Sequence, residues 1–406
     1  MNQPWSKRHK EEFGQCKFSL SNSYAEPLSM TELLDKVRAS GDAYGLMEKY
    51  RDHHLGYVPN GGSLDLRRDI ARVVYDDGLS GDEHVLVFPG GQIAIQTAAF
   101  AFASGCHSIA FAPGYQSTVQ SPNWIIGNEG LTVIPRSPEN DWQVDATKLR
   151  DAIRRNTKFL ILNEPHNPGG IVMSVALQRE IIDICRERDI VILCDEVYRL
   201  LEHDGDIRLP TMANSYEKGI SVVAMSKPWG GCGINIGWIA CRDRDMVRRM
   251  IDVQYFGCAC VSRASEIQAR MVLAVSETIL RERMNIILDN KSKLINFIEN
   301  EHGEWFEWRR PNAGAIAFVK FKGPWTSDVL GKHLARAGIS IKPAYCFVDE
   351  TTVAPTSEEV SKYFRIGYGE KEIASALEAL GEFVRAHESS WREALPSTRE
   401  TPVCSL

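Results

Sequence analysis

The sequence predicts an α/β protein with a large domain, built on a mainly parallel seven-stranded sheet flanked by helices, and a smaller α+β domain. From about residue 84, short apolar runs alternate with helix-like stretches, and this alternation stops near residue 285. The runs are continuously apolar, which indicates a sheet covered on both faces and is typical of parallel sheets. A chain of 406 residues is long enough for two domains.

Seven apolar runs are expected to form the strands of the large domain. Each is short and bounded by turn residues or by a helix-like segment such as SVALQREIIDICRERD (174–189). The expected strands are HVLVF (84–88), SIAFA (108–112), LTVIP (131–135), KFLILN (158–163), IVILC (190–194), ISVVAM (220–225) and IGWIAC (236–241).

The remaining segments are assigned by their position and pattern. After a long helical region come three strand-like runs, AGAIAFVKF (313–321), GISIKP (338–343) and YFRIGYG (363–369), and then a final helix. We therefore expect residues 55–285 to form the large domain and residues 286–390 the small one. Residues 1–54 precede the first strand and are assigned to the small domain, and the polar residues 391–406 to a loose tail.

Composition excludes several classes of protein. The net charge of −6 argues against nucleic acid or an anionic membrane as the main partner. No apolar run reaches the ~18 residues of a membrane span, and the polar start MNQPWSKRHKEEFGQ lacks the apolar segment of a secretion signal. The scattered cysteines fit reduced thiols and show no metal-binding spacing. We expect a cytoplasmic protein without a metal site.

Ligands of open parallel sheets bind at the carboxyl ends of the strands, so the residues that follow each strand carry the functional argument. PGGQ (89–92) follows the first strand and precedes a helix-like run. Glycines at such a turn expose backbone N–H groups, and the helix N-terminus attracts anions, phosphate above all. Taken alone, a plain tight turn is the more frequent explanation of this pattern.

Other strands end in side chains whose chemistry is complementary. A lysine can form an imine with a phosphorylated aldehyde cofactor. A carboxylate keeps the ring nitrogen of such a cofactor protonated, and amide or phenol groups donate to its ring oxygen. The sequence supplies these groups after three strands, as Asn163 and Asn167, as Asp195 and Tyr198, and as Lys227. Together they predict a site for pyridoxal 5'-phosphate (PLP).

Seven motifs in order resemble the class I/II aminotransferase family of PLP-dependent fold type I. The likeness runs from about Tyr57 to Gly369. Several segments, PHNPGG and RIGYG among them, are most similar to the capreomycidine synthase-like branch. The motifs are Y-x4-G-x3-LR (from Tyr57), PGGQ (89–92), PGY (113–115), NEPHNPGG (163–170), DEVY (195–198), SK-x5-G-x3-GW (226–238) and RIGYG (365–369).

The resemblance implies a role for each matching residue toward the cofactor. Lys227 would form the imine and then move the Cα proton. The other residues would hold the cofactor: Asp195 at the ring nitrogen, Asn167 and Tyr198 at the ring oxygen, Tyr115 stacked on the ring, and Gly91 and Gln92 around the phosphate.

The resemblance also implies how the substrate is bound and how the protein assembles. Arg365 would clamp the α-carboxylate of an amino acid through a bidentate contact. Tyr57 would reach the phosphate in the neighbouring subunit, which implies a homodimer.

Two positions depart from the family pattern. The residue eight after the lysine, normally an arginine that binds the phosphate, is Asn235, and the residue three before it, often serine, is Ala224. Either another cation compensates for Asn235, or the phosphate is held less tightly, or the chain no longer binds the cofactor. The last interpretation is disfavoured because Lys227, Asp195 and the other ring-binding positions are retained.

These observations predict a PLP-dependent enzyme that acts on a free L-amino acid. The first expectation is an aminotransferase with a 2-oxo acid as second substrate. The alternative is a cyclase or eliminating enzyme on a hydroxyarginine-like substrate, as in the capreomycidine synthase-like branch. A non-catalytic ligand-binding relative is the third possibility.

Overall fold

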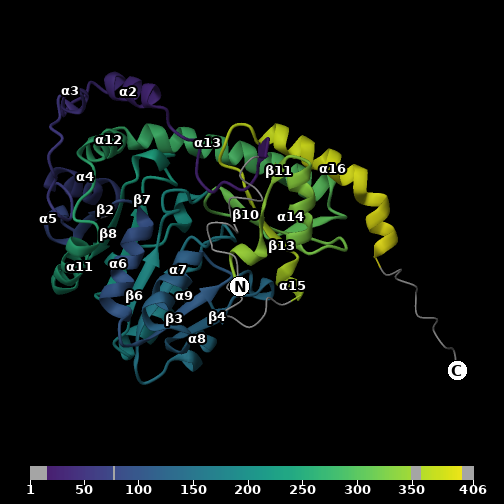
Figure 1. The fold of residues 1–406 in the computed structure, drawn as a ribbon, viewed down its shortest axis with the longest axis horizontal. Helices are drawn as coiled ribbons and strands as arrows, with labels where there is room; N and C mark the ends of the chain where they lie inside the picture. Colours follow the sequence, from purple (N-terminus) through teal and green to yellow (C-terminus); the bar gives the residue numbers. More distant parts are fainter. Residues whose placement is uncertain (1–15, 76–77, 349–357, 396–406) are drawn as a thin grey trace.

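The large domain of the computed structural model, which describes residues 16–75, 78–348 and 358–395, is built on a seven-stranded sheet (Figure 1). Its strand order is β2-β8-β7-β6-β5-β3-β4, and β8 alone runs in the direction opposite to the other six strands. The predicted mainly parallel seven-stranded sheet is confirmed. The strands are β2 (Val85–Phe88), β3 (His107–Ala112), β4 (Leu131–Pro135), β5 (Thr157–Asn163), β6 (Val191–Asp195), β7 (Gly219–Ala224) and β8 (Gly237–Cys241).

Helices cover both faces of this sheet, which explains the continuous apolar runs. Along β2, Val85 and Val87 pack with residues of α4 and α12, whereas Leu86 and Phe88 face the opposite side and pack with α6 and α11. Successive residues of the strand therefore point to opposite faces of the sheet, and both faces are buried. The helices of this domain are α4 (Leu64–Val74), α5 (Gly81–His84), α6 (Gly91–Ala103), α7 (Gln116–Ile126), α8 (Ala146–Ala152), α9 (Val175–Glu187), α10 (Met212–Ser215), α11 (Arg244–Gly257) and α12 (Arg263–Ala274).

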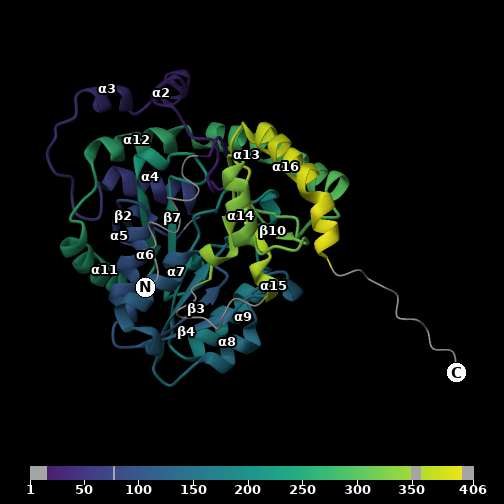
Figure 2. The ribbon, with the colours of Figure 1, turned by 45° about the vertical axis from the view of Figure 1, so that its right-hand side comes forward.

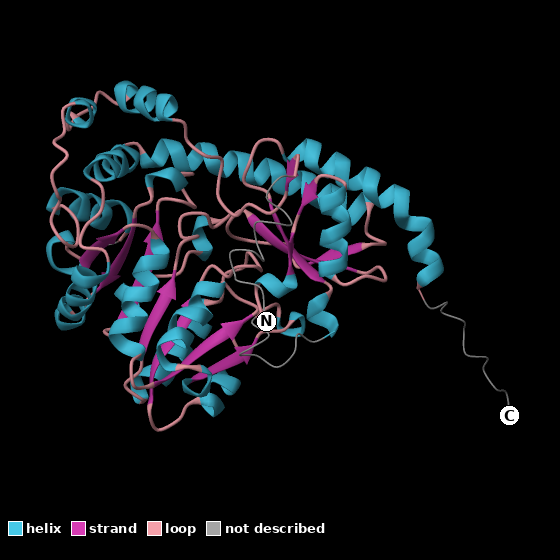
Figure 3. Ribbon diagram, viewed as in Figure 1, coloured by secondary structure: helices cyan, strands magenta, loops and turns pink. Residues whose placement is uncertain are grey.

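The small domain holds a separate antiparallel sheet, seen beside the large one in Figure 3. Its order is β12-β13-β10-β9, so the pair β10 and β13 forms its centre. Figure 2 shows the helices of this domain next to the sheet. The elements are β9 (Phe306–Trp308), β10 (Ile316–Phe321), α14 (Ser327–Arg336), β12 (Lys342–Pro343), α15 (Glu358–Ser361), β13 (Tyr363–Gly367) and α16 (Ile373–Ala394).

One long helix connects the two domains. α13 (Ser276–Ile295) has 20 residues and continues into a π-helical segment at Asn296–Glu301. In Figure 1 it lies in the upper part of the molecule, below α2, and runs from α12 toward α16. None of the helices in the described parts of the chain has the length and apolar character needed to cross a lipid bilayer.

The N-terminal segment contacts both domains, which differs from its predicted place in the small domain alone. Strand β1 (Phe18–Ser19) pairs in parallel with β11 (Ile339–Ser340) of the small domain. Helices α2 (Met30–Ala39) and α3 (Leu46–Arg51) instead lie next to α12 of the large domain, as Figures 1 and 2 show. Leu33, Val37 and Leu46 bury their side chains in the large-domain core there.

The predicted C-terminal tail begins too early. α16 extends to Ala394, and Trp391 within it is 1% exposed. Its ring packs edge-on against Trp305 and Phe321, so these residues belong to the core of the small domain. The rest of the predicted tail, from residue 396, lies outside the described residues.

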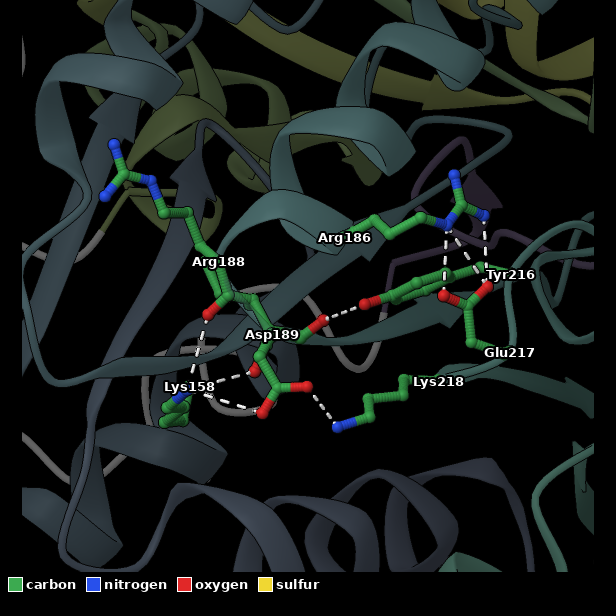
Figure 4. A network of polar contacts seen from close by, with 8 residues as sticks. Lys158, Arg186, Arg188, Asp189, Tyr216, Glu217 and Lys218 are labelled. Atoms are coloured by element: carbon green, nitrogen blue, oxygen red, sulfur yellow. Dashed lines mark hydrogen bonds and ion pairs between the residues drawn. The ribbon is translucent and has the colours of Figure 1, made fainter.

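A network of exposed polar contacts lies at the edge of the sheet where the parallel strands begin (Figure 4). Lys218, just before β7, forms an ion pair with Asp189, and Lys158 of β5 donates to the backbone oxygen of Asp189 at 3.4 Å. Arg186 binds Glu217 at 3.0 Å. Such exposed pairs contribute little to stability, typically below about 1 kcal/mol. Lys218 is therefore a suitable control position for substitutions at the opposite edge.

Candidate active site

A cavity of about 740 Å³ lies at the carboxyl edge of the large sheet, and residues of the small-domain sheet also line it. All of the sequence-predicted site residues except Tyr57 and Asn163 line this one cavity. They come from the ends of β2, β3, β5, β6 and β7, from the loop before β8, and from β13. The cavity-lining residues predicted from the sequence are Gly91, Gln92, Tyr115, Asn167, Asp195, Tyr198, Lys227, Asn235 and Arg365.

One end of the cavity is formed by the turn from β2 to α6. Gly90 has a φ of 89°, and α6 begins at Gly91 with its N-terminus at the cavity. A Cβ atom at Gly90 would lie only 2.8 Å from the Asn235 side-chain oxygen, so the backbone approaches Asn235 closely. Ala224 and Ser226 line the cavity as well. This end therefore offers backbone donors and neutral side chains to an anion.

Asn235 itself adopts a left-handed conformation, with a φ of 52° and a ψ of 43°. Asparagine tolerates this conformation better than most residues because its short polar side chain bonds locally. Its side chain is exposed to the cavity and makes no hydrogen bond within the described ranges. The amide is thus available to a ligand at the same end as Gly90.

Asp195 ends β6 at the bottom of the cavity and is 0% exposed. One carboxylate oxygen accepts a hydrogen bond from the Val197 backbone N–H at 3.3 Å, and the other, Oδ2, has no partner among the described atoms. Burial raises the pKa of this carboxyl to about 7, against the opposing effect of the Val197 hydrogen bond and Lys227. A buried, unpaired carboxylate oxygen is costly unless a ligand satisfies it. The protonated ring nitrogen of PLP fits this atom.

Lys227 follows β7, the strand parallel to β6, and lines the cavity at the same edge of the sheet as Asp195. Its Nζ donates to the Ser23 hydroxyl at 2.9 Å and lies 6.0 Å from the centre of the Tyr198 ring. Burial, and next the charge of Arg365, lower the pKa of the Lys227 ammonium to about 8. Near neutral pH a fraction of this amine is therefore unprotonated, as a nucleophilic lysine requires.

Arg365, in the central strand β13 of the small sheet, is 3% exposed. It donates to the Asn167 side-chain oxygen at 3.0 Å and to the Ser21 backbone oxygen at 2.7 Å, while its Nε has no partner. Its guanidinium lies over the Phe347 ring, 5.2 Å from the centroid. Within the described chain no carboxylate forms an ion pair with it. A buried guanidinium of this kind is suited to an anionic ligand.

The aromatic residues of the cavity are held in different ways. Tyr115 immediately precedes α7, and its hydroxyl accepts a hydrogen bond from the Gln92 side chain at 2.8 Å. Tyr198 is 1% exposed, and its hydroxyl has no hydrogen bond of normal geometry within the described residues. Burial raises the pKa of this hydroxyl to about 12, so it remains a donor. The Tyr198 hydroxyl and the Asn167 amide N–H groups are the donors available to a ring oxygen.

Sequence reasoning missed Ser23 and Lys342 as cavity residues. Ser23 lies in an irregular segment without a motif, so no local signal marks it. The signal for Lys342 is a lone charged residue inside the apolar run GISIKP. Tyr57, in contrast, does not line the cavity of its own chain. Its side chain is 91% exposed, and its backbone oxygen accepts from Arg263 at 2.7 Å.

Comparison with known sequences places this arrangement in a family. The profile described as "Aminotransferase class I and II" matches residues 35–380. Capreomycidine synthase of Streptomyces vinaceus is 23% identical over 214 residues, which are 52% of this chain and 54% of that protein. The chain thus spans about half the length of that relative. An aspartate aminotransferase of Rhizobium meliloti is 27% identical over 320 residues, which are 73% of this chain and 75% of that protein.

Comparison with solved structures extends the likeness to nearly the whole chain. A PLP-dependent aminotransferase from Streptococcus suis superposes with a TM-score of 0.82 at 25% identity, covering 95% of this chain and 99% of that one. N-Succinyldiaminopimelate aminotransferase from Mycobacterium tuberculosis has a TM-score of 0.76 at 21% identity, covering 90% and 92% of the two chains, and shares the fold. The fold type I prediction is confirmed, and this chain belongs to the class I and II aminotransferase family of PLP-dependent enzymes.

Proposed function

We propose that the protein is an aminotransferase that exchanges the amino group of a free L-amino acid with a 2-oxo acid. The observation that carries the proposal is the meeting of three groups around one cavity. These are the amine of Lys227, the unpaired buried carboxylate of Asp195 and the buried guanidinium of Arg365, which lacks a carboxylate partner in the described chain.

Each residue has a defined task in this reaction. Bound PLP supplies an aldehyde that condenses with amines and a ring that takes up electrons from Cα. Asp195 holds the ring nitrogen protonated through its free oxygen. Arg365 orients the amino acid by its carboxylate, and Asn167 fixes that guanidinium at 3.0 Å. Lys227, released from Ser23, would take the proton from Cα of the amino acid and, in the second half of the exchange, would donate a proton to Cα of the 2-oxo acid.

The cavity gives less support to the cyclase alternative. A hydroxyarginine-like substrate carries a guanidinium side chain, which needs carboxylates for binding. Among the described lining residues, Asp195 is the sole carboxylate, and it is assigned to the cofactor ring. The cations Lys227, Lys342 and Arg365 line the same space and would repel a second guanidinium. The non-catalytic alternative rests on Asn235 at the usual arginine position, and the cavity that brings Lys227, Asp195 and Arg365 together argues against it.

We also propose a homodimer in which Tyr57 of the partner subunit completes the phosphate site. Large apolar side chains rarely stand free on a monomer in groups. Here Leu55 is 95% exposed and Tyr57, two residues later, is 91% exposed. Arg263 links this segment to α12 through the backbone oxygens of Gly56 and Tyr57. An interface between two copies would bury these side chains.

The proposed phosphate end leads to a prediction for Asn235→Arg. The variant is expected to bind PLP about tenfold more tightly, because a guanidinium adds a charge-assisted hydrogen bond that the neutral amide cannot make. Fluorescence titration of the apoenzyme with PLP measures this affinity. Gly233→Arg is the matched control, since it adds the same charge to an open position of the same loop outside the cavity. Unchanged or weaker binding by Asn235→Arg would contradict the placement of the phosphate.

The proposed exchange is tested by the absorbance of the cofactor in the purified enzyme. A suitable L-amino acid alone is expected to convert the cofactor to its amine form in one half-reaction, and a 2-oxo acid is expected to restore the starting spectrum. Amines that lack the α-carboxylate should not react, because Arg365 has nothing to bind. Repeated turnover of arginine or hydroxyarginine without a 2-oxo acid, and without loss of the starting spectrum, would favour the cyclase instead.

A further inference from the structure

A second cation lies directly beside Arg365. Lys342 in β12 is the cross-strand partner of Arg365 in β13, in an antiparallel pair. Side chains of directly opposed residues project from the same face of a sheet, with their Cβ atoms about 5 Å apart. Both residues line the cavity. The small-domain sheet therefore presents two adjacent positive groups to the ligand.

This arrangement is costly in the absence of an anion. Like charges directly opposite each other destabilise a sheet, and the side chain of Lys342 forms no ion pair and no hydrogen bond with the described residues. A buried cation is usually paired with a carboxylate. Arg283, for example, is 2% exposed and forms an ion pair with Glu32 at 3.0 Å. Two neighbouring cations that lack a carboxylate indicate that a ligand supplies the negative charge.

The phosphate of the cofactor does not account for Lys342. The proposed phosphate end is the β2–α6 turn of the large domain, whereas Lys342 is on the small-domain strand next to the proposed carboxylate clamp. Burial, and next the charge of Arg365, lower the pKa of the Lys342 ammonium to about 8, so the group is still mostly cationic at neutral pH. One cation would bind the α-carboxylate and leave the other for a second anionic group.

We propose that Lys342 binds a carboxylate at the end of the substrate side chain, so that the enzyme selects acidic over neutral amino acids. This inference rests on the proposed function, since it names the substrate class of the same site. Lys342 is a specificity residue in this scheme: it contacts the substrate and takes no part in moving the proton.

Paired substrates that differ only in the side-chain charge test the inference. Wild-type enzyme is expected to prefer glutamate over glutamine and aspartate over asparagine in kcat/KM. Lys342→Met keeps the length of the side chain and removes its charge. It is expected to lower kcat/KM for the two acids by about 100-fold, the loss of one hydrogen bond to a charged group, and to leave the values for the two amides within a few-fold.

Two further variants separate charge from structure. Lys342→Arg keeps the charge and should retain most of the preference for acids. Lys320→Met removes a lysine from the neighbouring strand β10, where it pairs with Glu359 outside the cavity, and should change neither value. A wild-type preference for the amides, or an equal loss for acids and amides in Lys342→Met, would overturn the inference.

Binding without turnover distinguishes this inference from the proposed function. Calorimetry of the holoenzyme with succinate and glutarate is expected to show binding by wild type and Lys342→Arg, at least tenfold weaker binding by Lys342→Met, and weak binding of butyrate by all three. An enzyme whose cofactor reacts with no amino acid would refute the aminotransferase, yet this dicarboxylate difference would still support the subsite. Equal dicarboxylate binding by wild type and Lys342→Met would overturn the subsite, even if the enzyme proves to be an active aminotransferase.

Discussion

Lys227→Ala is expected to lower kcat by about four orders of magnitude or more, because it removes both the amine that forms the imine and the base that moves the Cα proton. The fold should persist, since Nζ makes a single hydrogen bond, to Ser23, and the side chain contributes little to the core. Thermal unfolding of the purified variant should therefore occur close to the wild-type temperature.

Chemical labelling identifies the lysine directly. Borohydride reduction of the holoenzyme, followed by peptide mapping, is expected to find the cofactor on Lys227 and on no other residue. Lys218→Ala is the control, because Lys218 lies at the far edge of the sheet in the network of Figure 4 and should leave kcat unchanged. A label on Lys342, the other lysine of the cavity, would show that the motif assignment is wrong.

Asp195→Ala is expected to reduce kcat by about three orders of magnitude, the cost typical of losing one well-placed electrostatic group. Without the free carboxylate oxygen the ring nitrogen would lose its proton, and the ring would accept electrons from Cα poorly. Asp195→Asn, which keeps the shape and removes the charge, should be similarly impaired. Steady-state kinetics at saturating PLP tests this, and near-normal turnover in either variant would contradict the role.

The same substitution has a second consequence for the apoenzyme. The pKa of Asp195 in the folded protein, about 7, lies above the value of about 3.9 in an unfolded chain. Between these values the folded state holds the proton more strongly, so the stability of wild-type apoenzyme falls as pH rises from 4 to 7. Asp195→Ala should lack this part of the pH dependence, which denaturant unfolding at several pH values can measure.

The large sheet could be predicted strand by strand because burial on both faces leaves a direct mark on the sequence. KFLILN (158–163), for example, coincides with β5 (Thr157–Asn163) to within one residue. Helices α2 and α3 show why the N-terminal segment was misassigned. They are short, and an apolar stripe reveals that a helix packs but not which domain it packs against. The start of the predicted tail is wrong because Trp391, whose buried ring anchors the end of α16, stands in the sequence among polar residues that suggest an exposed segment.

The candidate site could be predicted to the extent that its residues follow strands. Asp195 and Lys227 are positioned by strand ends, so sequence order and sheet topology already bring them to one edge. Ser23 could not be found in this way, because its contact with Lys227 joins residues 204 positions apart. Lys342 comes from a two-residue strand whose register, rather than its composition, puts it opposite Arg365. Only the folded arrangement reveals such neighbours.

The N-terminal segment contacts both domains, and this affects how the chain folds during synthesis. The Ser21 backbone oxygen that binds Arg365 leaves the ribosome 344 residues before its partner, and β1 likewise waits for β11. Closing a loop of this length is slow, because few conformations of the chain bring its ends together. The nascent large domain can therefore present Lys227 and Asp195 long before Arg365 joins them. A ribosome-stalled chain that stops short of β13 should fold its main sheet and still lack a pocket that discriminates between amino acids.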